Sequence, residues 1–163
     1  MLVASEHREI PALVLIAPYL GMPRWLRVAA ATHLLWGKLA GQVNGRNPRS
    51  IHDPIEREKN LAYGVITGRE LHELSEVVRR ARQSLADVRT PTMIIQSVED
   101  PRCSPATAEF TLKTLGSEDK ELVWTEGAGH IITVDYGRER VFAEVERWLS
   151  SHRRPGAAAA TKK

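Results

Sequence analysis

Three short apolar runs divide this chain, and between them apolar residues recur at helical spacing. The runs are ALVLIAP at 12–18, TMIIQ at 92–96 and ELVWT at 121–125. Continuous apolar runs of this length are typical of strands buried on both faces of a parallel sheet. The pattern therefore predicts three strands joined by helices, which is the arrangement of an α/β protein.

The segments between and after these runs predict three amphipathic helices. Thr67 and Glu70 form a T-x-x-E capping box that opens a helix expected to end near Asp87. A serine–proline pair at 104–105 predicts the first turn of a second helix, which a glycine ends at position 116. Apolar residues at helical spacing between 141 and 149 predict a final helix that closes near residue 152.

The 72 residues from Tyr19 to Thr90 are far longer than an ordinary connection between strands. We interpret this segment, called the insertion below, as a helical cap over the ends of the strands. Residues 41–54 are polar and rich in turn-forming types, which predicts a loop. Residues 24–40 predict a mostly apolar helix that packs on one side and lines an acyl or alcohol pocket on the other, through Trp25, Leu26, Leu34, Leu35 and Trp36.

The expected architecture is an α/β fold: a parallel sheet of three strands with flanking helices and a helical cap insertion. With 163 residues, 42% of them hydrophobic, the chain has material for one core. We expect one domain over residues 1–151, with the cap at 19–90, followed by a disordered basic tail at 152–163.

Charge excludes one class of partner. The formal charge of +3 depends on four cations in the tail, and without them residues 1–151 carry −1. Arg79, Arg80 and Arg82 lie among glutamates, with no interleaved aromatic residues that could stack on bases. Nucleic acid is therefore not an expected partner.

The cysteine content and the hydropathy pattern indicate the cellular compartment and which cofactors to expect. Cys103 is the single cysteine, which excludes an intrachain disulfide and a CxxC metal site and favours a reducing compartment, the cytoplasm. Charged residues interrupt segment 24–40, so no transmembrane segment is predicted, and residues 1–10 lack the pattern of a signal peptide. The histidines show no ligand spacing with acidic partners, so we expect neither a metal nor another cofactor.

Two residues that could carry chemistry follow the second and third strands. Asp100 comes shortly after TMIIQ, and His130 follows ELVWT after a loop of small residues. In parallel sheets function gathers at the carboxyl ends of the strands, where an acid and a base can meet. On spacing alone, a turn aspartate and an ordinary loop histidine would be the better description of most such pairs.

The strings around both residues resemble an α/β-hydrolase of the carboxylesterase and monoacylglycerol lipase group. PTMIIQSVEDPRCSP is similar to the family pattern that ends in the triad aspartate, and GHIITVD to the one that contains the triad histidine. The likeness covers nearly the whole chain apart from the tail. It implies that Asp100 orients His130, and that His130 acts as general base and then general acid.

The nucleophile of that family has no counterpart here. The family places its serine in a G-x-S-x-G elbow, and no such motif occurs in the 163 residues. The resemblance implies that the elbow would lie about three helical turns before Met1. Ser5, Ser97 and Ser104 lack the exposed strand-to-helix setting of a nucleophile. Cys103 is the best substitute, but a plain loop cysteine is the simpler interpretation, so we expect the chain alone to be inactive.

The resemblance implies a serine hydrolase acting on carboxylic esters of a small or lipid-like alcohol. An amide- or peptide-cleaving hydrolase would use the same residues and stays open. A different class of function also stays open: a catalytically inactive remnant that acts as an interaction module, or as a homodimer through the exposed edge of the first strand.

Overall fold

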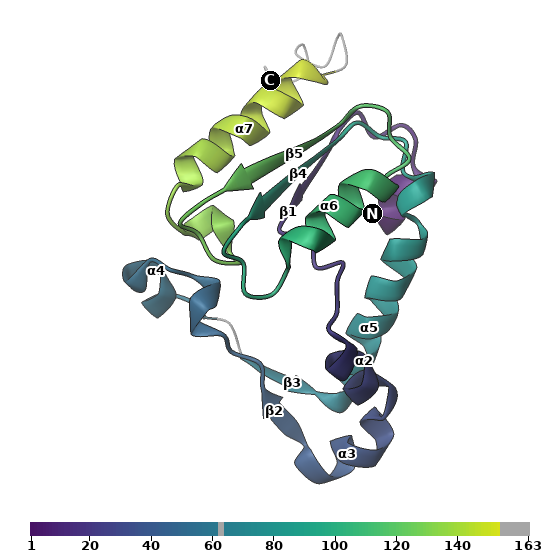
Figure 1. The fold of residues 1–163 in the computed structure, drawn as a ribbon, viewed down its shortest axis with the longest axis vertical. Helices are drawn as coiled ribbons and strands as arrows, with labels where there is room; N and C mark the ends of the chain where they lie inside the picture. Colours follow the sequence, from purple (N-terminus) through teal and green to yellow (C-terminus); the bar gives the residue numbers. More distant parts are fainter. Residues whose placement is uncertain (62–63, 154–163) are drawn as a thin grey trace, which may run out of the picture.

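The computed structural model describes residues 1–61 and 64–153. In Figure 1 a small sheet with helices on both sides forms the upper part of the molecule, and the insertion extends below it. The α-helices and strands are α1 (Leu2–Glu6), β1 (Leu13–Ile16), α2 (Arg24–Ala31), α3 (His33–Ala40), β2 (Gln42–Asn44), α4 (Pro54–Glu58), β3 (Val65–Thr67), α5 (Gly68–Gln83), β4 (Thr92–Ser97), α6 (Pro105–Thr114), β5 (Lys120–Thr125) and α7 (Arg138–Ser151).

The main sheet is parallel, with the order β1-β4-β5, which confirms the predicted fold class. Leu15 of β1 pairs with Ile94 of β4, which pairs on its other side with Leu122 of β5. All six residues of β4 are buried, because this strand lies between the other two and under helices on both faces. The two edge strands are only partly buried.

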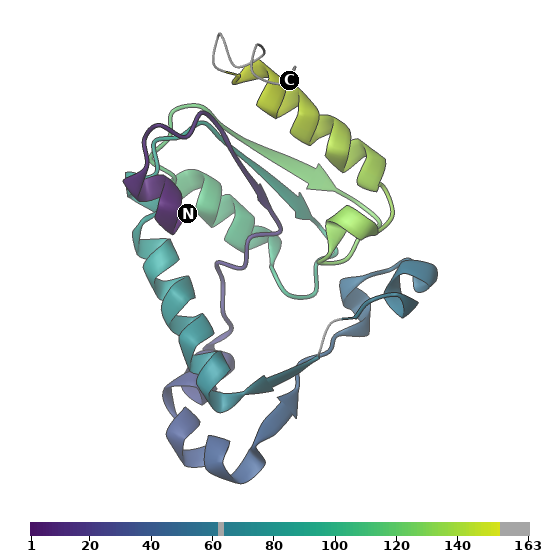
Figure 2. The same ribbon diagram turned by 180° about the vertical axis from the view of Figure 1, so that it is seen from behind.

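Alternation along the strands sends side chains to two separate cores. Leu15 and Ile94 face the first core, which they form with residues of α1, α5 and α6. Val14 and Met93 face the second, which α7 covers through Val141 and Trp148. Figures 1 and 2 show α7 on one side of the sheet and α5 and α6 on the other. The result is a three-layer helix–sheet–helix body.

The three predicted amphipathic helices start close to the expected positions. Thr67 and Glu70 form the expected capping box at the start of α5. That helix ends at Gln83 and is followed by a 3-10 turn over Leu85–Asp87. Of the tail predicted to be disordered over 152–163, the structure describes His152 and Arg153, and His152 Nε2 lies 2.9 Å from Asp119 Oδ2. Residues 154–163 lie outside the described part of the chain.

The insertion differs from the prediction in its secondary structure. The single helix expected over 24–40 is two helices, α2 and α3, which meet at Thr32. The hydroxyl of Thr32 donates to the Val28 carbonyl at 2.9 Å, a side-chain bond that bends helices. The loop expected over 41–54 contains β2, which pairs with β3 more than twenty residues further on. A local pattern does not show a partner so distant.

The predicted packing of the apolar insertion residues is wrong for three of the five. Trp25, Leu34 and Leu35 are between 69% and 76% exposed, whereas Leu26 and Trp36 are half-buried. The indole Nε1 of Trp36 donates to the Ala29 carbonyl at 2.7 Å, which joins α3 to α2. The break at Thr32 turns the two halves of the predicted apolar side in different directions.

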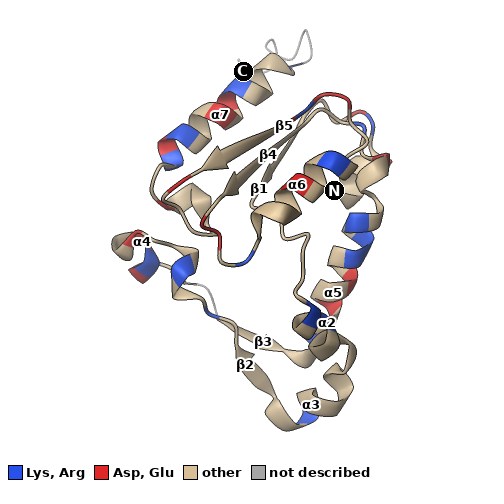
Figure 3. Ribbon diagram, in the orientation of Figure 1, with Lys and Arg blue, Asp and Glu red and all other residues tan. Residues whose placement is uncertain are grey.

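Charges of both signs are spread over the helices. Figure 3 shows acidic and basic residues interspersed along α7, and both signs on α5. Within residues 1–61 and 64–153, no helix is long and apolar enough to cross a membrane.

Candidate active site

Asp100 and His130 meet at the carboxyl ends of β4 and β5. Asp100 lies in the turn that follows β4, and His130 in the loop between β5 and the 3-10 turn Ile132–Val134. Because the two strands are parallel neighbours, their ends bring the side chains together although thirty residues separate them. Asp100 Oδ2 lies 2.8 Å from His130 Nδ1.

The carboxylate of Asp100 is held from several directions. Its Oδ1 accepts the backbone amides of Arg102 at 2.7 Å and Cys103 at 3.0 Å. Its Oδ2 accepts the side-chain amide of Gln96 at 2.9 Å as well as the His130 contact. Burial alone would raise the pKa of Asp100, but these hydrogen bonds outweigh it and hold the pKa below its usual value. Asp100 is therefore ionised and fixed in place.

Small residues and hydrogen bonds shape the loop that carries His130. Gly127 has a positive φ of 78°, a conformation that glycine adopts without steric cost. Ser97, the last residue of β4, donates its hydroxyl to the Ala128 carbonyl at 2.5 Å. Glu99 accepts the Gly127 amide at 2.8 Å. The histidine loop (residues 127–135) is thus tied to the end of the central strand that also carries Asp100.

Asp135 is a buried carboxylate in the same loop, at a position where the sequence predicts a turn or packing residue. It is 2% exposed, and both of its oxygens accept backbone amides. Burial alone would raise its pKa, but the amides outweigh burial and hold the pKa below the usual value. The final position of the GHIITVD motif was the only indication in the sequence.

The depressed pKa of Asp135 predicts a specific dependence of stability on pH. An unfolded aspartate titrates near pH ~3.9, so the stabilisation is complete above about pH 4 and is lost as pH falls through the lower pKa of the folded state. Asp135→Asn is expected to lose less stability than the wild type between about pH 6 and pH 3, although it is less stable at neutral pH. Urea unfolding across that range measures the difference.

Asp87→Asn is the matched control for that measurement, because Asp87 is exposed and the substitution removes the same charge. Its stability curve is expected to run parallel to that of the wild type. Parallel curves for Asp135→Asn and the wild type would contradict the prediction.

Cys103 lies beside Asp100 and His130, called the pair below, without being activated by them. Its Sγ is 3.9 Å from His130 Nδ1, and the residue is 0% exposed. Burial first, and the Asp100 carboxylate second, raise the pKa of Cys103 to about 12. Asp100, Cys103 and His130 offer ligand atoms within 4.8 Å of one another. A metal ion would have to displace the proton of this thiol and the hydrogen bonds of the Asp100 carboxylate, so the set fits an acid–base pair better than a metal site.

The thiol is expected to resist alkylation in the folded protein. A pKa of about 12 leaves about one thiolate in ten thousand at pH 8, and the thiolate is the reactive form. Iodoacetamide should therefore modify Cys103 at least about a hundredfold faster in urea than in buffer. Mass spectrometry over time measures both rates, and equal rates would show that Cys103 is accessible and ionised.

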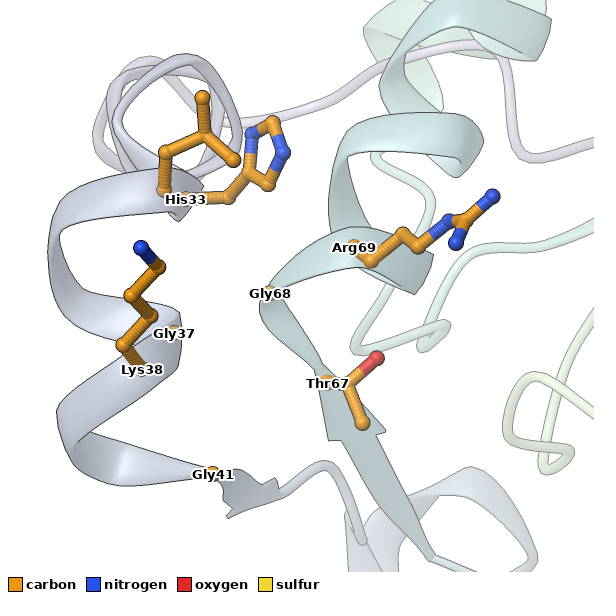
Figure 4. A pocket seen from close by; sticks show the side chains of 8 residues that line it. His33, Gly37, Lys38, Gly41, Thr67, Gly68 and Arg69 are labelled. Carbon is orange, nitrogen blue, oxygen red and sulfur yellow. The ribbon is translucent and has the colours of Figure 1, made fainter.

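A cavity in the insertion lies apart from Asp100 and His130. It measures about 290 Å³ and lies between α3 and the start of α5. Figure 4 shows His33 and Lys38 on one side of it and Thr67 and Arg69 on the other. Of the five apolar insertion residues expected to line an acyl pocket, Leu34 alone borders this cavity.

Comparison with known proteins identifies the family. Residues 1–136 match the family model described as serine aminopeptidase, S33. The chain belongs to this family of α/β-hydrolases. Membership of the S33 family agrees with the sheet order and with an acid and a histidine at adjacent strand ends.

Two curated relatives of this S33 chain are a carboxylesterase and a monoacylglycerol lipase. It is 24% identical over 108 residues to a carboxylesterase of Bacillus subtilis (strain 168), covering 66% of the chain and 42% of that protein. It is 24% identical over 152 residues to a thermostable monoacylglycerol lipase of Bacillus sp. (strain H-257), covering 92% and 57% respectively. The chain spans about half the length of these curated relatives.

Solved structures show the same fold. The monoacylglycerol lipase of Paleococcus ferrophilus superposes with a TM-score of 0.76 at 18% identity, covering 92% of this chain and 63% of that one. One of the metagenome-derived lipolytic enzymes LipS and LipT superposes with a TM-score of 0.79 at 25% identity, covering 92% and 59%.

Proposed function

We propose that this chain carries the acid and base of a serine hydrolase that cleaves carboxylic esters, and that the nucleophilic serine lies in a segment outside these 163 residues. The observation that carries the proposal is the 2.8 Å contact between Asp100 Oδ2 and His130 Nδ1. With Nδ1 engaged by the carboxylate, Nε2 is the ring nitrogen left to exchange a proton. The His130 side chain is 23% exposed, so part of the ring is open to a reactant.

In the proposed reaction, His130 Nε2 takes the proton of the serine hydroxyl as that oxygen attacks the ester carbonyl. Asp100 stays ionised and stabilises the imidazolium. The tetrahedral intermediate then expels the alcohol, to which His130 returns the proton, and an acyl-enzyme remains. Water attacks the acyl group with His130 again as base, which releases the acid and restores the serine.

Two described serines near the pair, Ser97 and Ser104, are unsuited to the role of nucleophile. Ser97 is fully buried and its hydroxyl is bonded to the Ala128 carbonyl. Ser104 Oγ lies 3.1 Å from the Thr107 hydroxyl at the start of α6. Neither hydroxyl is hydrogen-bonded to His130, which supports a nucleophilic serine from elsewhere.

The test compares two forms of the protein with a serine-directed fluorophosphonate probe. A tag at the C-terminus allows the natural-length protein to be isolated from its source cells, beside the 163-residue chain made separately. We expect one labelled serine in the natural-length protein, located by peptide mass spectrometry, and no labelling of the 163-residue chain. His130→Gln should abolish the labelling, whereas His7→Gln, at an exposed position remote from the pair, should keep it.

Labelling of the 163-residue chain would show that it contains a nucleophile of its own, and an unlabelled natural-length protein would refute the serine hydrolase. Substrate preference needs a separate assay with a nitrophenyl ester and a nitroanilide of one acyl group. We expect cleavage of the ester, because the relatives are a carboxylesterase and a monoacylglycerol lipase.

One observation favours a second function, an inactive interaction module. Among the residues that the structure describes, β1 pairs with β4 on one side and with no strand on the other. Edges with free backbone groups and apolar side chains favour strand pairing. A homodimer through β1 would appear as a doubled mass in light scattering. Proline at Val14 should return it to a monomer, because the amides of Leu13 and Ala17 donate to β4 and the Val14 amide faces the open side. A monomeric 163-residue chain would contradict this alternative.

A further inference from the structure

We infer that Asp135 is a positioning residue: its carboxylate fastens the histidine loop to residues 49–53 of the insertion and so holds His130 at Asp100. The inference rests on the proposed function, because it assigns Asp135 a role in the geometry of that pair. It adds that the insertion, and not the sheet alone, sets the place of the histidine.

Asp135 joins two parts of the chain that lie more than eighty residues apart. Its Oδ2 accepts the amides of Gly129 and His52, each at 2.7 Å. Its Oδ1 accepts the amides of Asp53 at 2.8 Å and Tyr136 at 2.9 Å. Gly129 directly precedes the histidine, while His52 and Asp53 belong to the insertion. One buried carboxylate therefore fixes the backbone beside His130 to the insertion.

The backbone on the other side of His130 is fastened to the same segment. The Ile131 amide donates to the Ser50 carbonyl at 2.9 Å. A Cβ at Gly129 would come within 2.6 Å of the Ser50 carbonyl oxygen, so only glycine permits this close approach. His52 Nδ1 also lies 3.0 Å from the Gly127 carbonyl oxygen. The residues that precede and follow His130 are both held against segment 49–53.

Segment 49–53 is in turn held to the loop that carries Asp100. Arg102 Nε donates to the Ser50 hydroxyl at 3.0 Å, and its Nη2 donates to the Gly45 carbonyl at 2.7 Å. The backbone amide of the same arginine binds Asp100 Oδ1 at 2.7 Å. The insertion thus contacts the loop that carries Asp100 through Arg102, and the histidine loop through Asp135. It therefore bridges the two members of the pair.

A carboxylate suits this position better than an amide. Four N–H groups point at the two oxygens of Asp135, so acceptors are required on both sides of the group. In Asp135→Asn, one side becomes an NH₂ donor that faces two other donors, and those buried amides lose their partner. The hydrogen-bond partners of Asp135 are backbone amides and not the His130 ring, so its effect on the pair passes through the backbone.

The test is an NMR comparison of the isotope-labelled 163-residue chain with Asp135→Asn. In the wild type we expect a slowly exchanging, strongly downfield proton on His130 Nδ1, because that nitrogen is hydrogen-bonded to Asp100. In Asp135→Asn we expect this signal to disappear and the hydrogen-exchange protection of the Gly129 and Ile131 amides to fall by about tenfold or more. The methyl signals of Ile94 and Ile95 in β4 should stay, which shows that the sheet is folded.

The outcomes separate the two claims. A wild-type spectrum without the downfield His130 proton would refute the proposed acid–base pair itself. A folded Asp135→Asn variant that keeps the signal would refute the positioning role, since a purely structural residue would lower the melting temperature and leave the pair intact. Asp87→Asn, an exposed charge removal, should leave signal and protection unchanged.

A second measurement on the unmodified chain covers the case in which Asp135→Asn does not fold. If Asp135 joins the segments, the amides of His52, Asp53, Gly129 and Ile131 belong to one cooperative unit and exchange with one opening free energy. Fast exchange of His52 and Asp53 beside a protected Gly129 would overturn the inference.

Discussion

Asp100→Asn is expected to lower the kcat of the proposed serine esterase by about four orders of magnitude, as the equivalent change does in serine proteases with this triad. The asparagine keeps the shape of the side chain, but it is neutral and cannot stabilise the imidazolium that forms when His130 takes the serine proton. It also favours the wrong tautomer of the ring. Steady-state hydrolysis of a nitrophenyl ester measures kcat and KM, and we expect KM to change little.

Asp87→Asn provides the control for charge, since Asp87 is exposed on the 3-10 turn that follows α5. It should keep the wild-type rate. A loss of less than about tenfold in Asp100→Asn, with the fold intact by circular dichroism, would show that Asp100 is not the acid of the triad.

Ile94→Ala is expected to destabilise the chain by about 2–5 kcal/mol, which is the usual range for truncating a fully buried aliphatic side chain. Ile94 is 0% exposed in the middle of the central strand, where both neighbouring strands and the helices of the first core surround it. The cavity left by the missing methyl groups cannot be filled from either side. Urea unfolding at equilibrium gives the free-energy difference.

Leu39→Ala is the matched control, because Leu39 is 90% exposed on α3. Its effect should stay within about 0.5 kcal/mol. If Ile94→Ala cost less than about 1 kcal/mol, the packing around β4 would be looser than the structure shows.

The sheet was predictable because each of its strands has a local sequence pattern. Each consists of a short apolar run, and in β4 the run is continuous because helices cover both faces. The same pattern predicted that Asp100 and His130 would lie at one edge of the sheet, because residues that follow neighbouring parallel strands meet there. The catalytic roles of the two residues stay predictions that depend on the family resemblance.

The insertion was less predictable because its structure depends on distant partners. β2 lies in the turn-rich segment that predicted a loop, and its partner β3 lies more than twenty residues further on. The break between α2 and α3 is at Thr32, whose hydroxyl donates to the preceding turn. Asp135 looked like a turn residue for the same reason. Its importance comes from the amides of His52 and Asp53, which no window around position 135 contains.

Among the described residues β1 has no strand on its outer side, so protein design could add one there. A parallel strand added beside β1 would end at the same edge as β4 and β5, where Asp100 and His130 already lie in contact. A designed strand–turn–helix module docked there would deliver its turn residue toward a preassembled acid–base pair. Serine, cysteine and threonine could then be compared as nucleophiles against one fixed histidine, with the added segment as the only variable.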